Sequence, residues 1–251
     1  MATDRPERQE PADYHARMYE HYSTTHMTPA GPLTRRELLR SATRLSAQIG
    51  RFLPPDRGAA ILDVGCGAGE VVWFMQHRGY RRAIGIDLSA EQVAFARSLG
   101  LEGVEQADAG EYLGSHPDEF DLITVFDVLE HIPKNEVLGF LDALRGALKT
   151  GGRMIIHTAN GESPFGGRYL YGDFTHETAY TGRSIRQLSR VVGFREISVS
   201  EVQPVPHGAL SAIRFVLWKV LRSLLVGFLV VETGVLRGHI LSQNLLAVAR
   251  K

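Results

Sequence analysis

Hydrophobic residues in this chain form short continuous runs that alternate with helical patterns. The run at residues 59–64 is apolar except for Asp63, as expected of a strand that is buried on both faces of a sheet. Six further runs of strand character follow, at residues 82–87, 103–106, 120–126, 153–158, 196–202 and 243–250. Strands that alternate with helices predict a doubly wound α/β sheet, with ligand bound at the carboxyl ends of the strands.

The helices between these runs are indicated by capping residues and by helical spacing. Ser89 is typical of an N-cap and predicts a helix over residues 90–99. Apolar residues at helical spacing in 137–148 predict a second helix that stops at the Gly151-Gly152 pair, and Ser184 predicts the start of a third.

A glycine-rich turn follows the first strand. Gly65, Gly67 and Gly69 remove every second Cβ, so the backbone can turn sharply and approach a ligand before a helix starts at Glu70. A dinucleotide site needs a small residue where Glu70 stands, and the carboxylates of Asp63 and Glu70 favour a positively charged ligand over a pyrophosphate. We therefore expect S-adenosylmethionine as the ligand; the alternative is a plain turn from strand to helix.

Two more carboxylates lie where this ligand needs partners. Asp87 ends the second strand beside the glycine turn, so it can accept hydrogen bonds from both hydroxyls of a ribose. Asp108 follows the third strand and can accept one from an adenine amino group, although such a residue is more often a solvated turn residue.

These motifs resemble the class I S-adenosylmethionine-dependent methyltransferases, through residues 62–69, 85–89 and 120–123 together with Asp108. The resemblance covers about residues 55–200 and implies a seven-stranded, mostly parallel sheet. It also implies cofactor contacts: Asp63, Gly65, Gly67 and Gly69 at the methionine end, Asp87 at the ribose, and Leu88, Asp108 and Ala109 around the adenine.

Composition sets looser bounds. The chain has 28 basic and 28 acidic residues without a basic stripe, which argues against a nucleic-acid partner. Cys66 is the only cysteine, so internal disulfides are excluded and a reducing compartment is favoured. Residues 1–12 lack the apolar core of a signal peptide. We expect a cytoplasmic protein.

We expect a methyltransferase domain at residues 55–251, preceded by an N-terminal helical arm at residues 1–54. A helix around residues 14–22 could close over the cofactor, with Tyr22 as a contact, or simply pack on the core. Within the domain we expect an acceptor loop at residues 159–181 and a helical insertion at residues 207–240 before the last strand.

Methyl transfer from a sulfonium is an in-line displacement, and an acceptor with a high pKa also needs a base. Asp127 and His131 follow the fourth strand, at the edge of the expected cleft. Asp127 is expected to touch the methionine moiety or to support the turn. His131 is as consistent with a structural role as with a catalytic one.

The acceptor loop has aromatic residues but no apolar periodicity, which is typical of a functional loop. It brings Asp173, His176 and Glu177 into one short run, where carboxylates can hold a histidine in one tautomer and raise its basicity. His176 is thus a candidate general base supported by Asp173; the alternative is that His176 only pins the loop. The spacing matches no dedicated ligand pattern, so no metal is expected.

The loop also resembles that of a bacterial methyltransferase group from polysaccharide and nucleotide-sugar pathways, through residues 160–166 and 173–177. This resemblance suggests O-methylation of a sugar hydroxyl. The alternatives are O- or N-methylation of another small metabolite, such as a natural product or a quinone-like compound, and a non-catalytic S-adenosylmethionine-binding module.

Residues 209–231 form an apolar helical pattern that also contains Arg214, Lys219 and Arg222. Its longest uninterrupted apolar run, residues 224–231, is too short to span a bilayer. We expect this helix to pack against the sheet; a peripheral membrane contact and a homodimer contact are the alternatives.

Overall fold

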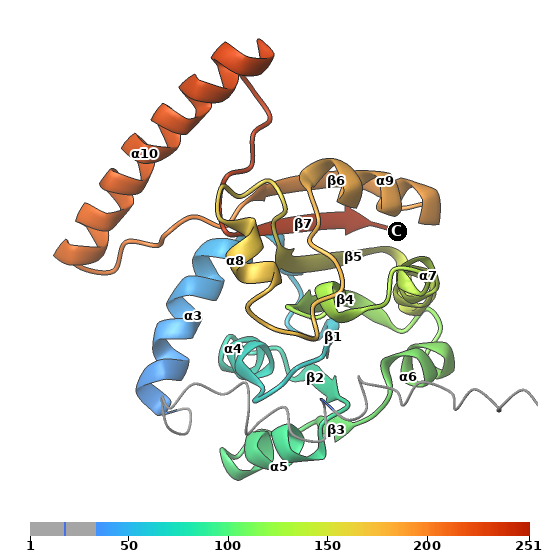
Figure 1. The fold of residues 1–251 in the computed structure, drawn as a ribbon. Coiled ribbons are helices and arrows are strands. Elements are labelled where there is room, and N and C mark those ends of the chain that lie inside the picture. Colours follow the sequence, from blue (N-terminus) through green and yellow to red (C-terminus); the bar gives the residue numbers. More distant parts are fainter. Residues whose placement is uncertain (1–17, 19–33) are drawn as a thin grey trace, which may run out of the picture. The chain divides into compact units, whose positions relative to one another are not determined.

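Seven strands form one sheet in the described part of the chain, which comprises Met18 and residues 34–251 of this computed structural model (Figure 1). The strands are β1 (Ala60–Val64), β2 (Arg82–Asp87), β3 (Val104–Gln106), β4 (Phe120–Phe126), β5 (Leu148–Ala159), β6 (Arg195–Glu201) and β7 (Asn244–Arg250). Their order is β3-β2-β1-β4-β5-β7-β6, and β7 runs antiparallel to both of its neighbours. The predicted doubly wound, mostly parallel sheet is confirmed.

Helices cover both faces of this sheet (Figure 1). The helices of the described part of the chain are α3 (Arg35–Ile49), α4 (Glu70–His77), α5 (Ala90–Ser98), α6 (Ala109–Ser115), α7 (Val137–Ala147), α8 (Gly166–Leu170), α9 (Gly182–Val192) and α10 (Ala209–Thr233), with short 3-10 helices η1 (Gly50–Phe52) and η2 (Leu129–His131). Successive strand residues point to opposite faces, so Ile61 packs with α3 and α4 while Leu62 packs with α6, α7 and α9.

Two helix boundaries differ from the prediction. The second predicted helix ends at Ala147, because Leu148 already pairs with Phe120 as the first residue of β5. Thr181, not Ser184, caps α9: the Thr181 side chain accepts from the Ser184 amide, and the Ser184 side chain accepts from the Thr181 amide. Ser89 caps α5 as predicted.

Helix α3 packs against helix α4. Its apolar face buries Leu45 and Ile49 in the same cluster as Phe74 of α4. The predicted cofactor contact Tyr22 lies outside the described residues.

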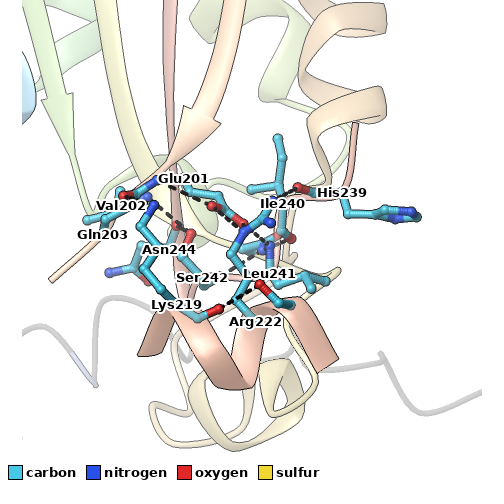
Figure 2. Close-up of polar contacts among 12 residues, drawn as sticks. Glu201, Val202, Gln203, Lys219, Arg222, His239, Ile240, Leu241, Ser242 and Asn244 are labelled. Atoms are coloured by element: carbon cyan, nitrogen blue, oxygen red, sulfur yellow. Dashed lines mark hydrogen bonds and ion pairs between the residues drawn. The ribbon is translucent and has the colours of Figure 1, made fainter. Parts of the chain in front are cut away.

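Helix α10 does not pack on the sheet, contrary to the expectation. Of its residues only Ser211 is buried, whereas Leu217 and Leu224 are 58% and 66% exposed. The helix is carried by connecting segments at its two ends, and its polar side faces the domain through Arg222 and Lys219 (Figures 1 and 2). None of the helices in the described residues combines the length and the hydropathy needed to cross a bilayer.

Candidate functional site

The strand order reverses between β1 and β4, and the carboxyl ends of these neighbouring strands are where an open α/β sheet binds its ligand. The glycine turn follows β1, Asp87 ends β2, and Asp127 follows β4. The fold therefore brings the predicted cofactor residues of three strands to one edge of the sheet.

Glycine is required at the positions of this turn for different physical reasons. Gly65, Gly67 and Gly69 all have positive φ, at 68°, 50° and 81°. A Cβ on Gly65 would collide with the side chain of Val128, so this glycine allows close packing. A Cβ on Gly67 would meet nothing within 4 Å, so this part of the turn borders open space that a ligand can occupy.

Asp87 is tied to the turn by two backbone hydrogen bonds. The Gly67 amide donates to its Oδ2 at 2.7 Å, and the Ser89 amide donates to its Oδ1 at 2.8 Å. Each oxygen keeps a further lone-pair direction for a diol. Next to it, Leu88 is 57% exposed, an apolar surface suited to the flat face of a base.

The other predicted adenine contacts lie at the start of α6. Asp108 is exposed and caps this helix, its Oδ1 accepting from the Glu111 amide at 3.0 Å. Ala109 is the first residue of the helix and is half-buried. The cap leaves Oδ2 of Asp108 as the oxygen available to an adenine amino group.

The carboxylates on either side of the glycine turn have unlike surroundings. Asp63 is buried and accepts from the Thr124 hydroxyl at 2.6 Å; burial above all, together with the charges of Asp87 and Glu70, raises its pKa to about 7. Glu70 instead forms an ion pair with Arg44 and accepts from Ser41. The expectation that Glu70 serves a cationic ligand is therefore weakened, because α3 already compensates its charge.

This donor and acceptor set fits S-adenosylmethionine. The Asp87 carboxylate suits the ribose, the open backbone at Gly67 allows close approach, and the buried Asp63 carboxyl gains from a nearby ammonium or sulfonium charge.

The acceptor loop and the segment after β4 meet through two histidines. The rings of His131, in η2, and His176, in the loop, lie edge to face with centroids 4.7 Å apart. The loop is also held to η2 through its backbone, since the amide of Glu177 donates to the carbonyl of Glu130 at 2.7 Å. Residues far apart in sequence thus form one cluster.

Hydrogen bonds define the tautomer of both rings. His176 Nδ1 lies 3.1 Å from the Tyr169 carbonyl, which can only accept, so Nδ1 carries the proton. The Thr175 hydroxyl donates to Asp173 Oδ1 at 2.7 Å, so it accepts from Nδ1 of His131 at 2.9 Å. In both rings Nε2 is therefore the nitrogen with the lone pair.

The same cluster has the composition of a two-histidine, one-carboxylate cation site. Ligand atoms of His131, Asp173 and His176 all lie within 4.8 Å of one another. The sequence spacing did not indicate this, because His131 comes from a different segment. Burial and the neighbouring His176 lower the pKa of His131 to about 4, so this ring is neutral around pH 7.

Asp127 and Glu130 belong to the same segment as His131 and bond to residues of β5. Asp127 has φ of 53°, rare for a residue with a side chain, and its carboxylate contacts Nδ1 of His157 at 2.8 Å. Buried Glu130 accepts from the Thr158 hydroxyl, and burial together with the charge of Asp127 raises its pKa to about 7. Sequence analysis missed Thr175, His157 and Glu130, because their roles arise only through contacts between segments.

The sheet order and the open glycine turn are those of an α/β protein that binds a nucleoside-like ligand at the carboxyl ends of its strands. Comparison with known families agrees: residues 35–199 match the family model of the methyltransferase domain. The chain therefore belongs to the methyltransferase domain family, and S-adenosylmethionine is the cofactor that this membership indicates, as expected.

Among curated proteins, the chain is similar to ubiquinone biosynthesis O-methyltransferases. It is 38% identical over 108 residues to that of Aeromonas salmonicida, which covers 41% of this chain and 44% of the relative. It is 36% identical over 111 residues to that of Xylella fastidiosa, covering 42% and 44%. The match thus spans less than half of these relatives.

Solved structures share the fold. A SAM-dependent methyltransferase from Archaeoglobus fulgidus has a TM-score of 0.61 at 21% identity, over 87% of this chain and 100% of that one. Phosphoethanolamine N-methyltransferase 2 of Haemonchus contortus, in complex with S-adenosyl-L-methionine, has a TM-score of 0.60 at 17% identity, over 93% of this chain and 60% of that one.

Proposed function

We propose that this chain is an O-methyltransferase of a small acceptor, in which His176 removes the proton of the acceptor hydroxyl. The observation that carries the proposal is the pair of histidines whose Nε2 atoms hold lone pairs. Val128 links this pair to the cofactor turn, since its side chain borders Gly65 and its carbonyl accepts from the His131 amide at 2.9 Å.

In the proposed reaction the acceptor oxygen attacks the methyl carbon as the carbon–sulfur bond breaks. The electron pair of that bond stays on sulfur, which gives S-adenosylhomocysteine, and the hydroxyl proton passes to Nε2 of His176. Asp63 and Asp87 position the cofactor for this transfer.

His176 is preferred over His131 as the base. A ring with a pKa of about 4 binds a proton weakly, so His131 is suited to orient the acceptor as a neutral hydrogen-bond acceptor. The chain from Asp173 through Thr175 to His131 then acts as a positioning device.

For the acceptor we favour a phenolic hydroxyl on a quinone-like ring. The similar curated proteins are ubiquinone biosynthesis O-methyltransferases, and a phenol loses its proton more readily than a sugar hydroxyl. Exposed aromatic side chains on the loop, such as Phe165 and Tyr171, at 78% and 83% exposure, offer faces on which a ring can stack.

A sugar hydroxyl is the second candidate. It is favoured by the loop residues 160–166 and 173–177, which resemble those of polysaccharide-associated methyltransferases, and the same aromatic faces suit a saccharide. A sugar hydroxyl is less acidic, so it would depend more strongly on His176.

The two acceptors are separated by assaying S-adenosylhomocysteine formation with catechols and hydroxylated quinols on one side and nucleotide sugars on the other. Mass spectrometry of the product identifies the methylated atom. Turnover of a phenol but of no sugar supports the favoured acceptor, and turnover of nucleotide sugars alone overturns it.

A chelator added to the same assay tests how the histidine cluster works. Turnover that survives the chelator supports proton transfer to His176. Loss of turnover that added Mn²⁺ restores would assign His131, Asp173 and His176 to a metal ion instead.

A further inference from the structure

Exposed large hydrophobic residues are concentrated on α10 and just after it in the described part of the chain. Most of the exposed large hydrophobic residues of the described chain belong to α10 or to the residues just after it. They are Leu210, Ile213, Val216, Leu217, Val220, Leu221, Leu224, Leu225, Phe228, Val231, Val235 and Leu236. Isolated exposed hydrophobic residues are ordinary, but a continuous surface of this kind marks a site of interaction.

The orientation of α10 about its own axis is set by polar contacts (Figure 2). Arg222 Nε donates to both carboxylate oxygens of the largely buried Glu201 at 2.8 Å, and an Arg222 terminal nitrogen donates to the His239 carbonyl at 3.1 Å. Lys219 donates to Gln203 at 2.9 Å, and Ser211 Oγ accepts from the His207 amide at 2.7 Å. These contacts hold the polar side of α10 toward the domain, so the apolar side faces outward.

The outward apolar side of α10 is wider than the stripe that two paired helices bury between them. At 100° per residue, the exposed apolar positions of α10 from Leu210 to Val231 cover about half of the helix circumference. Two helices that pair along a seam bury a narrower stripe, whereas a helix lying in a bilayer interface immerses a whole side.

The charge of this segment complements anionic lipid. Residues 209–239 contain four basic residues, Arg214, Lys219, Arg222 and Arg237, and one acidic residue, Glu232. Since Arg222 is paired with Glu201, the net charge that remains is 4 − 1 − 1 = +2, in a chain whose net charge is zero. Arg214 and Arg237 are exposed. Lys219 Nζ lies over the rings of Phe215 and Trp218 on the side that faces the domain. At 100° per residue, Arg214 instead falls within the outward apolar arc.

We propose that α10 is a peripheral membrane anchor, whose apolar side lies in the interface of a bilayer that contains anionic lipid. The inference goes beyond the proposed reaction and does not depend on the acceptor. It gives the enzyme access to an acceptor that carries a lipid tail, and it requires no spanning segment.

Vesicle sedimentation of the purified chain tests the proposal. With phosphatidylcholine vesicles that contain phosphatidylglycerol, the chain is expected to sediment at low salt and to be partly released at high salt. Pure phosphatidylcholine is expected to bind it more weakly. Absence of binding to the anionic vesicles at low salt overturns the proposal.

Matched variants test the surface itself. Leu217→Glu combined with Leu224→Glu is expected to lower the partition coefficient at least about tenfold, whereas Val191→Glu on α9, 67% exposed in the wild type, leaves it unchanged. Arg214→Gln and Arg237→Gln are each expected to lower it roughly fivefold, with Arg81→Gln as the control. Equal binding by the double glutamate variant contradicts the assignment.

Sedimentation velocity distinguishes lipid from a second copy of the chain. All changed side chains are exposed, so thermal melting and cofactor binding should match the wild type. A concentration-dependent dimer that the double glutamate variant abolishes, without vesicle binding by the wild type, would assign the surface to self-association and overturn the lipid proposal. If the double variant does not fold, Phe228→Glu alone repeats the test.

Discussion

The cofactor half and the acceptor half of this site are built by different means. At the cofactor half, backbone groups of the turn hold Asp87, and every participant lies at the end of a strand. At the acceptor half, side chains of η2 and of the loop 159–181 contact one another directly. In the proposed function the first half binds the nucleoside part of the cofactor, and the second half supplies chemistry that can change with the loop.

The largest expected difference between the cofactor half and the acceptor half is the effect of substitutions on turnover. His176→Ala should lower kcat by roughly 10²–10⁴ because the hydroxyl proton loses its acceptor, while cofactor affinity stays near that of the wild type. His131→Ala should have a smaller effect on kcat and a larger one on the acceptor KM.

Both variants are assayed on the same acceptor, with Glu162→Ala, an exposed residue of the same loop that has no assigned role, as the control. If His131→Ala abolished turnover while His176→Ala kept it, the roles assigned to the two histidines would be reversed.

The packing of the turn predicts the next largest effect, on stability. Gly65→Ala forces a residue with a Cβ into a left-handed conformation and against Val128, at a combined cost of about 2–4 kcal/mol. Gly79→Ala, with φ of 90° but open space around it, should show only the conformational part, about 1–2 kcal/mol.

Urea unfolding measures both variants, and Val128→Ala in the Gly65→Ala background should recover part of the loss. Equal costs at positions 65 and 79 would show that the turn is not packed against η2.

The prediction with the smallest effect per pH unit is a pH dependence of stability. The buried Asp63 carboxyl keeps its proton up to about pH 7 in the folded state, whereas the unfolded state releases it near 3.8. The folded state therefore binds more protons in between, so stability falls as the pH rises from about 4 to about 7, by up to about 1.4 kcal/mol per pH unit, and is level above.

Urea midpoints of cofactor-free protein across this range should show a shallower decline for Asp63→Asn. Glu130→Gln should act in the same direction, since the pKa of Glu130 is also raised to about 7. Parallel profiles for Asp63→Asn and wild type would contradict the assignment.

The same contrast explains what sequence alone could predict. The turn and Asp87 follow from local residue order, because glycine spacing and the end of a strand fix where the backbone goes. The pairing of His131 with His176 and the role of Thr175 depend on how the loop returns to the sheet, which no local pattern encodes.

Helix α10 shows a related limit of prediction from sequence. Its amphipathic pattern was visible in the sequence, but the pattern does not say whether the apolar side meets the sheet or the outside. The ion pair between Arg222 and Glu201 decides this, and it joins residues on separate elements.

The central claim, that the two halves work separately, is tested most directly by calorimetric titration of S-adenosylmethionine into Asp87→Ala and His176→Ala. Loss of the ribose partner should weaken binding to Asp87→Ala about ten- to a hundredfold, equivalent to about 1.5–3 kcal/mol, and leave His176→Ala at the wild-type affinity. Unchanged affinity in Asp87→Ala, or equal losses in both variants, would contradict this account.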